Sequence, residues 1–265
     1  MQIRFTQRPQ VWALAAGLLA SSATMAAQVN LTVTVENFAP ENSVTFAPLR
    51  VGFHSGVFDS FDLGGAAGPE IQAIAEGGSD ALWRPAFEAA DPDAVVGSVL
   101  PGPLLPGQMA TTTFTIDTEL NPYFSFAAMV VPSNDFFIGN DDPTAYRLFN
   151  DDGVLQIDHI AQYGRDVWDA GTEQFDPTAA AFIDGATNAN RTDQNSVVAF
   201  NFAEFYAYNG LTTAAGYTFD AQLEGATPIY GISFAIAPVP EPETYAMMLA
   251  GLGLMGAVAR RRMRR

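Results

Sequence analysis

The chain has 265 residues, no cysteine and a formal net charge of −17. The lack of cysteine excludes disulfide scaffolds, cysteine-zinc sites, iron–sulfur clusters and thiol catalysis. All 12 basic residues are arginines and only five of them lie between residues 28 and 237, so we expect no nucleic-acid partner, because phosphate binding needs a basic face. Such an acidic surface favours solubility and cations such as Ca²⁺, although a solvated face adapted to salt is an equally good interpretation.

Residues 1–27 have the pattern of a secretory signal peptide. Arg4 and Arg8 precede an apolar stretch over residues 11–20, and small residues follow up to Ala26 and Ala27. Positive charge, a short apolar core and a small-residue cleavage zone in this order are typical of signal peptides. A membrane helix is the alternative, but the apolar run is well short of the roughly 20 residues that span a bilayer. We therefore expect export.

Residues 28–237 are expected to form one β-rich domain. In residues 29–36 apolar and polar side chains alternate, which is the period of a strand buried on one face. The alternation recurs in two later segments, and residues rich in Gly, Pro, Asn and Asp separate further apolar runs. This pattern predicts an all-β fold, an antiparallel β-sandwich. The expected strands are residues 29–36, 45–53, 108–116, 123–130, 197–206, 217–224 and 230–236.

One region, residues 69–90, departs from the alternation. Isolated apolar residues lie among alanines there, whereas the glycines at 77–78 and Pro85 interrupt the pattern. We therefore expect one or two short helices inserted in the sandwich.

Three stretches of the domain carry more specific information. Residues 49–64 read LRVGFHSGVFDSFDLG and 69–77 read PEIQAIAEG; residues 128–139 read AMVVPSNDFFIG; residues 167–173 read VWDAGTE. In this order they resemble the spondin N-terminal domain family, which includes the F-spondin and mindin domains and many secreted bacterial proteins. The resemblance implies a spondin-like antiparallel β-sandwich, in agreement with the alternation.

In that family, carboxylates of the second and third stretches bind a divalent cation. Transferred to this sequence, the resemblance implies Asp135, Asp169 and Glu173 as ligands of Ca²⁺. Calcium prefers several hard oxygen ligands, and Gly171 allows a loop in which two carboxylates four residues apart converge. The family more often has aspartate at the last position, so Glu173 is expected to change geometry or affinity. The alternative is that all three are solvated loop carboxylates.

No catalytic motif stands out, and we do not expect an enzyme. His54 and His159 are the only histidines, and His54, next to Phe53 in an expected strand, is interpreted as structural. Residues 52–56, GFHSG, place the serine one position too late for the nucleophile elbow. A carboxylate pair for glycoside hydrolysis stays open, since many acids are present. We expect an adhesion or interaction module; a secreted hydrolase of matrix glycans and a structural coat protein are the alternatives.

Residues 238–265 contain a short motif, an apolar segment and a basic tail, in that order. Pro240, Glu241 and Pro242 precede an apolar run over residues 245–259, and five arginines follow. This arrangement resembles the PEP-CTERM sorting signal of Gram-negative bacteria. Prolines end the preceding fold, the apolar run can enter the inner membrane transiently as a helix, and the arginines resist translocation.

The resemblance implies processing by an exosortase-type enzyme and an association with extracellular polysaccharide, biofilm matrix or a surface protein. A plain membrane anchor is the alternative, but it accounts for the arginines and not for the motif. We expect the mature protein at the cell envelope, on the cell surface or in the extracellular matrix, after cleavage near this motif.

Overall fold

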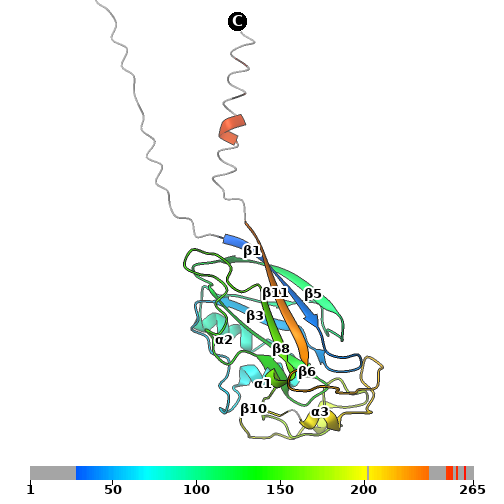
Figure 1. Cartoon of the computed structure of the whole chain (residues 1–265). Coiled ribbons are helices and arrows are strands. Elements are labelled where there is room, and N and C mark those ends of the chain that lie inside the picture. The colour runs from blue at the N-terminus through cyan, green and yellow to red at the C-terminus, as the bar shows by residue number, and fades with distance from the viewer. Residues whose placement is uncertain (1–27, 202, 239–248, 253–254, 256–259, 261–265) are drawn as a thin grey trace, which may run out of the picture.

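The structure is a computed structural model that describes residues 28–201, 203–238, 249–252, 255 and 260. In these residues two antiparallel sheets face each other, which confirms the expected all-β, sandwich-like fold (Figure 1). The four-stranded sheet has the order β5 (Met109–Asp117), β1 (Gln28–Asn37), β11 (Pro228–Pro238), β8 (His159–Tyr163). The seven-stranded sheet has the order β10 (Ala199–Phe200), β9 (Trp168–Asp169), β7 (Phe136–Gly139), β6 (Tyr123–Val131), β3 (Leu49–His54), β4 (Val95–Val99), and β2 (Thr45–Phe46) pairs with β6.

Strand β1 follows its alternating sequence closely. Its apolar residues Val29, Leu31, Val33 and Val35 are buried, while the residues between them are partly exposed. β1 pairs with both β5 and β11, and Val29 lies opposite Pro238. The first and last strands of the domain are therefore direct neighbours, and they begin and end at the same edge of the molecule (Figure 1).

Aromatic side chains fill the space between the two sheets. The ring of Phe53 in β3 lies 5.2 Å from that of Phe114 in β5, and the rings of Phe124 in β6 and Phe234 in β11 are 5.0 Å apart. Each pair joins one sheet to the other, and aromatic pairs of this kind add packing energy beyond the area that they bury. This core holds the sheets at a fixed separation.

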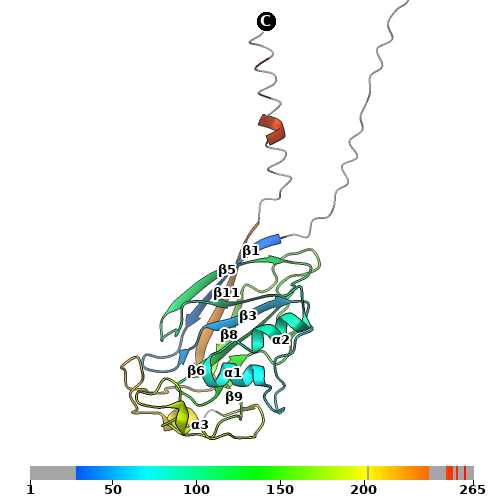
Figure 2. The same cartoon turned by 180° about the vertical axis from the view of Figure 1, so that it is seen from behind.

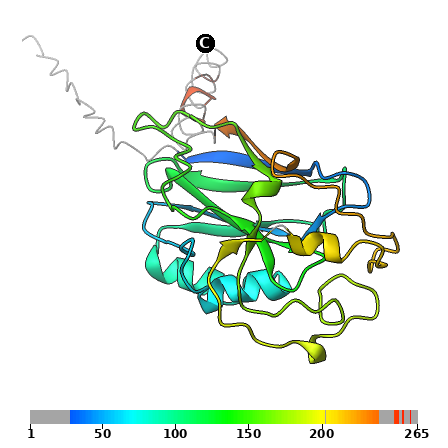
Figure 3. The same ribbon diagram turned by 60° about the horizontal axis from the view of Figure 1, so that its bottom comes forward.

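The two expected helices are present, as α1 (Pro69–Gly77) and α2 (Trp83–Ala90). They cover the outer face of the seven-stranded sheet, so that the molecule has three layers (Figures 2 and 3). Strand β6 is consequently buried on both faces, which accounts for its continuous apolar sequence. Pro85 does not interrupt α2 as expected, because it lies in the first turn, where a helix needs no N–H donor.

Three of the expected strands, 45–53, 197–206 and 217–224, are not continuous strands in the structure. The run 45–53 forms two strands, β2 and β3, since Pro48 between them has no N–H for a strand ladder. Residues 197–206 contain only the short β10 followed by helix α3 (Ala203–Ala207). The helix buries Phe205 and brings Tyr208, three residues later, to the same side.

Residues 217–224 are buried alternately, as expected, but they form no strand. Phe219 and Leu223 are buried in the main core. Their backbone partners lie in loops: the Phe219 N–H donates to the Leu211 carbonyl and the Asp220 N–H to the Asn42 carbonyl. The period of two therefore predicted burial correctly and sheet pairing wrongly, because loops satisfy this backbone.

The hydrophobic helices expected at the two ends receive no support. Residues 1–27 lie outside the described residues, and of 245–259 only 249–252 and 255 are described, in helical conformation. Nowhere in the described part of the chain is there a helix with the length and apolar character needed to cross a bilayer.

Candidate functional site

Adjacent strands bring two of the expected ligand-bearing loops together. Asp135 immediately precedes β7, and Asp169 ends β9. These strands pair antiparallel with Phe136 opposite Asp169. The second and third stretches of the family resemblance therefore meet at one end of the seven-stranded sheet.

Asp135 is 2% exposed and holds the loop that follows β9. Its Oδ2 accepts hydrogen bonds from the Thr172 N–H (2.7 Å), the Thr172 hydroxyl (3.1 Å) and the Glu173 N–H (2.9 Å). These bonds favour the ionised carboxylate, but burial and then the Asp169 charge outweigh them and raise the pKa of Asp135 to about 6. Near neutral pH Asp135 thus carries a charge that its surroundings compensate only in part.

Asp169 is 8% exposed and accepts a hydrogen bond on each oxygen. The Gly171 N–H donates to Oδ1 at 2.7 Å, and the Asn201 amide donates to Oδ2 at 2.9 Å. Gly171 has a φ of 67°, and a Cβ atom there would lie 2.8 Å from the Val197 carbonyl oxygen. Only glycine fits this turn.

Two residues that the sequence did not single out, Asn201 and Glu204, extend this group. The Asn201 amide nitrogen donates to Glu204 Oε1 at 2.6 Å as well as to Asp169. Burial, followed by the charges of Asp169 and Asp135, raises the pKa of Glu204. The charges that raise the pKa values of Asp135 and Glu204 thus belong to other carboxylates of the same group. An Asn and a Glu three residues apart were the only signal in the sequence.

Glu173 pairs with an arginine. Its Oε1 lies 2.9 Å from Arg191 Nε, and Arg191 also reaches Glu76, with Nη1 3.5 Å from Glu76 Oε2. Burial raises the pKa of Glu173 to about 7; the Arg191 charge lowers it and the Glu76 charge raises it. The structure therefore brings Asp135 and Asp169 together, whereas Glu173 is neutralised by Arg191.

The donor set fits a calcium ion in part. Among the described residues, no group of three or more His, Cys, Asp or Glu side chains is arranged to hold one metal ion. Asp135 and Asp169 supply hard oxygens, and the charge of Asp135 is compensated only in part, which is the chemistry that Ca²⁺ prefers. Glu173 does not fit in the same way, because it would have to exchange Arg191 for the cation.

His54 has the contacts of a structural residue. It is fully buried, its Nδ1 accepts the Gly56 N–H at 2.9 Å, and Nε2 therefore carries the proton and donates to Ser125 Oγ at 2.9 Å. Burial lowers the pKa of His54 to about 4. Ser55 donates to Asp91 at 2.7 Å and not to His54, so residues 52–56 contain no serine–histidine pair.

Residues 238–265 match the family model described as the PEP-CTERM protein-sorting motif, which confirms the predicted sorting signal with Pro240, Glu241 and Pro242. The motif indicates an exosortase-targeted protein that is exported and sorted to the cell surface in Gram-negative bacteria. No curated protein matches the chain. Neither finding supports the resemblance to the spondin N-terminal domain, which stays a prediction.

Proposed function

We propose that residues 28–237 act as a calcium-dependent adhesion or interaction module on the cell surface or in the extracellular matrix, and that they are not an enzyme. The observation that carries this proposal is the sorting motif after the domain, since it indicates delivery to the surface by way of an exosortase. In this proposal the apolar run over residues 245–259 holds the protein in the inner membrane transiently, until the exosortase cuts near Pro240, Glu241 and Pro242. The partner is extracellular polysaccharide or a surface protein.

The calcium part of the proposal rests on Asp135 and Asp169. A bound cation would neutralise two buried carboxylates whose charges repel each other. Calcium would then stabilise the native chain, because it binds the folded form and not the unfolded form. The spondin resemblance supports the same pair, since both residues lie at the matching positions of its second and third stretches.

The burial of Asp135 and Glu173 supports a binding module over a glycan hydrolase that would use these two carboxylates. A general acid must reach the substrate and needs a pKa near the working pH. Asp135 and Glu173 have raised pKa values, but they are only 2% and 4% exposed and are bonded to the protein itself. The other alternative, a coat protein without a specific ligand, predicts that calcium has no effect on stability.

The localisation can be tested in a Gram-negative host that has an exosortase. The full chain would carry a C-terminal epitope, and a triple variant would replace Pro240, Glu241 and Pro242 with alanine. We expect the original chain to lose the epitope and appear on the surface or in the matrix, and the variant to keep it and stay with the inner membrane. Equal processing of both chains would contradict the proposal.

A further inference from the structure

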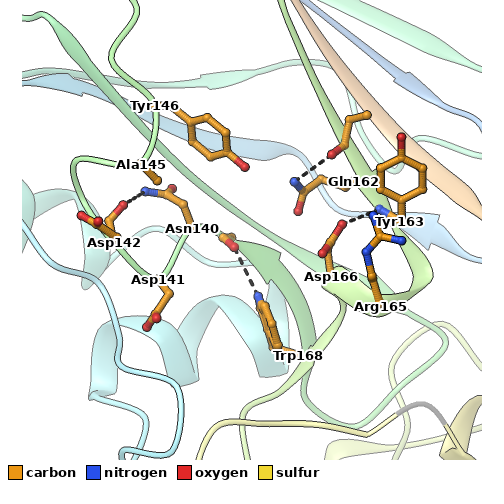
Figure 4. Close-up of a pocket in the computed structure, with 12 residues that line it drawn as sticks. Asn140, Asp141, Asp142, Ala145, Tyr146, Gln162, Tyr163, Arg165, Asp166 and Trp168 are labelled. Carbon is orange, nitrogen blue, oxygen red and sulfur yellow. Dashed lines mark hydrogen bonds between the residues drawn. The ribbon is translucent and has the colours of Figure 1, made fainter. Parts of the chain in front are cut away.

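A polar pocket with a volume of about 380 Å³ lies where the chain crosses from one sheet to the other (Figure 4). One wall is β8, the edge strand of the four-stranded sheet, with the 3₁₀ helix η1 (Gly164–Asp166) that leads to β9. The opposite wall is the end of β7 and the loop over residues 140–146. Because strands of both sheets form the walls, the pocket is built into the framework of the fold.

Three aromatic side chains line this pocket, and the fold fixes each of them. The Trp168 indole N–H donates to the Gly139 carbonyl at 3.2 Å. The Arg165 guanidinium lies 4.5 Å from the centre of the Tyr163 ring. Tyr146 packs against the buried Phe126, with 5.9 Å between the two ring centres. All three are partly exposed, so they present apolar surface to a ligand at a small cost in conformational entropy.

The polar groups of the pocket are also held in place. Gln162 is 4% exposed and interacts with the hydroxyl of Tyr146, whose pKa is raised by burial. This hydroxyl is therefore neutral and can both donate and accept. Asn140 positions the facing loop, since its amide donates to Ser125 Oγ at 3.0 Å and to the Asp142 carbonyl at 2.9 Å.

Carboxylates supply further acceptors at the rim. Asp166 Oδ2 accepts the Tyr163 N–H at 2.9 Å, and Asp141 Oδ1 accepts the Leu63 N–H at 2.8 Å. Each bond holds one oxygen of the carboxylate in place, so that the second oxygen can accept a hydrogen bond from a hydroxyl of a ligand. Hydrogen bonds from ligand hydroxyls to carboxylates are among the stronger kinds.

The charge of the pocket narrows the class of ligand. Asp141, Asp142 and Asp166 carry three negative charges against the one positive charge of Arg165, which gives a net charge of −2. Phosphate, sulfate and uronate groups would be repelled. The volume lies near the lower end of the roughly 300–1,000 Å³ of small-ligand sites, which suits one or two sugar rings.

We infer that this pocket binds a neutral sugar residue of a polysaccharide. The apolar face of a pyranose ring would pack on the aromatic side chains, and its hydroxyls would bond to Tyr146, which Gln162 holds in place, and to the rim carboxylates. The inference rests on the proposed function, because it names the ligand class of the surface module.

Affinity gel electrophoresis of the exported protein tests the inference. The gels would contain dextran, galactomannan or soluble cellulose derivatives without charge, and alginate would serve as the anionic comparison. We expect retardation by at least one neutral polymer and none by alginate. The same neutral polymer should change the fluorescence of Trp168, since Trp83 is fully buried elsewhere.

Two conservative variants locate the binding. Tyr146→Phe removes only a hydroxyl, and Asp166→Asn keeps an oxygen that can accept the Tyr163 N–H; each should weaken retention about tenfold. Tyr217→Phe and Asp158→Asn, which change the same groups outside the pocket, are the matched controls and should bind like the original chain. Circular dichroism would verify that all four remain folded.

Several outcomes would overturn the inference. These are a lack of retardation by every neutral polymer, equal retardation by alginate, or unchanged binding by both pocket variants. Failure of the proposed function is distinguishable, because it would show as loss of surface display in the localisation experiment while sugar binding by the purified protein persisted.

Discussion

A Cβ atom on Gly52 of β3 would lie 2.3 Å from Cζ of Phe87 in α2, so the glycine is the reason that this helix can pack against the sheet. Phe87 is fully buried and its ring is 4.2 Å from that of Phe58 and 4.9 Å from that of Trp83. The ring therefore has no room to move away from a larger residue at position 52.

We predict that Gly52→Ala lowers the free energy of unfolding by about 1–3 kcal/mol, which is the usual cost of overpacking a core. Gly77→Ala is the control, because no atom beyond its chain neighbours and the backbone of its own helix lies within 4 Å of a Cβ at that position. Urea denaturation measures both. Combining Gly52→Ala with Phe87→Leu should recover part of the loss; a double variant as unstable as the sum of the two single variants would refute the steric explanation.

The buried ion pair between Glu173 and Arg191 gives a second prediction. Arg191→Met leaves Glu173 buried without its cation, so the free energy of unfolding at pH 8 should fall by about 3–5 kcal/mol. Adding Glu173→Gln should restore much of it. Arg147→Met breaks the exposed pair with Asp151 and should cost at most about 1 kcal/mol. Equal losses in the two arginine variants would contradict this assignment.

His54 should make stability depend on pH. Burial lowers its pKa in the folded chain to about 4, below the ordinary value of 6.5, so the unfolded chain binds more protons between these two values. The stability that the neutral imidazole contributes is complete above pH 6.5 and is lost as the pH falls toward 4, by about 3 kcal/mol in all.

The test compares His54→Gln with the original chain by urea denaturation at pH 7 and pH 4.5. The free energy of unfolding of the original chain should exceed that of the variant by a large amount at pH 7 and by a smaller amount at pH 4.5. His159→Gln, at the exposed histidine, is the comparison variant. A constant difference for His54→Gln would disprove the assignment.

Calcium should raise the melting temperature of the exported protein, and a chelator should reverse the rise. Asp135→Asn should abolish this response, because the amide removes a charged ligand. Without calcium the variant should melt no lower than the original chain, since repulsion by Asp169 is relieved. Asp184→Asn, at an exposed carboxylate, should leave the response intact. A melting temperature indifferent to both calcium and chelator would count against calcium binding.

The sequence predicted those elements whose burial follows a simple period. β1 has one buried face and alternates accordingly, and α1 and α2 interrupt that alternation. Residues 217–224 alternate without forming a strand, because a period of two reports which side chains are buried and not what their backbone pairs with. At the site, the pairing of β7 with β9 brings Asp135 to Asp169.

Other contacts have no local signature. Arg191 reaches Glu173 from a distant loop, and Asn201 joins Asp169 to Glu204. The pocket likewise combines residues of the β7 and β8 regions that no motif connects. Such contacts depend on how loops pack together, which the spacing of residues along a chain does not encode.

The position of β11 has a consequence for the order in which the protein matures. This last strand lies between β1 and β8, and in the described chain β8 has no other strand neighbour. A polypeptide that emerges amino end first cannot close this sheet until residue 238 has crossed, and the sorting motif follows directly. The last strand that this sheet needs and the sorting motif therefore emerge one directly after the other, so no signal for processing is outside before every strand of the sheet is.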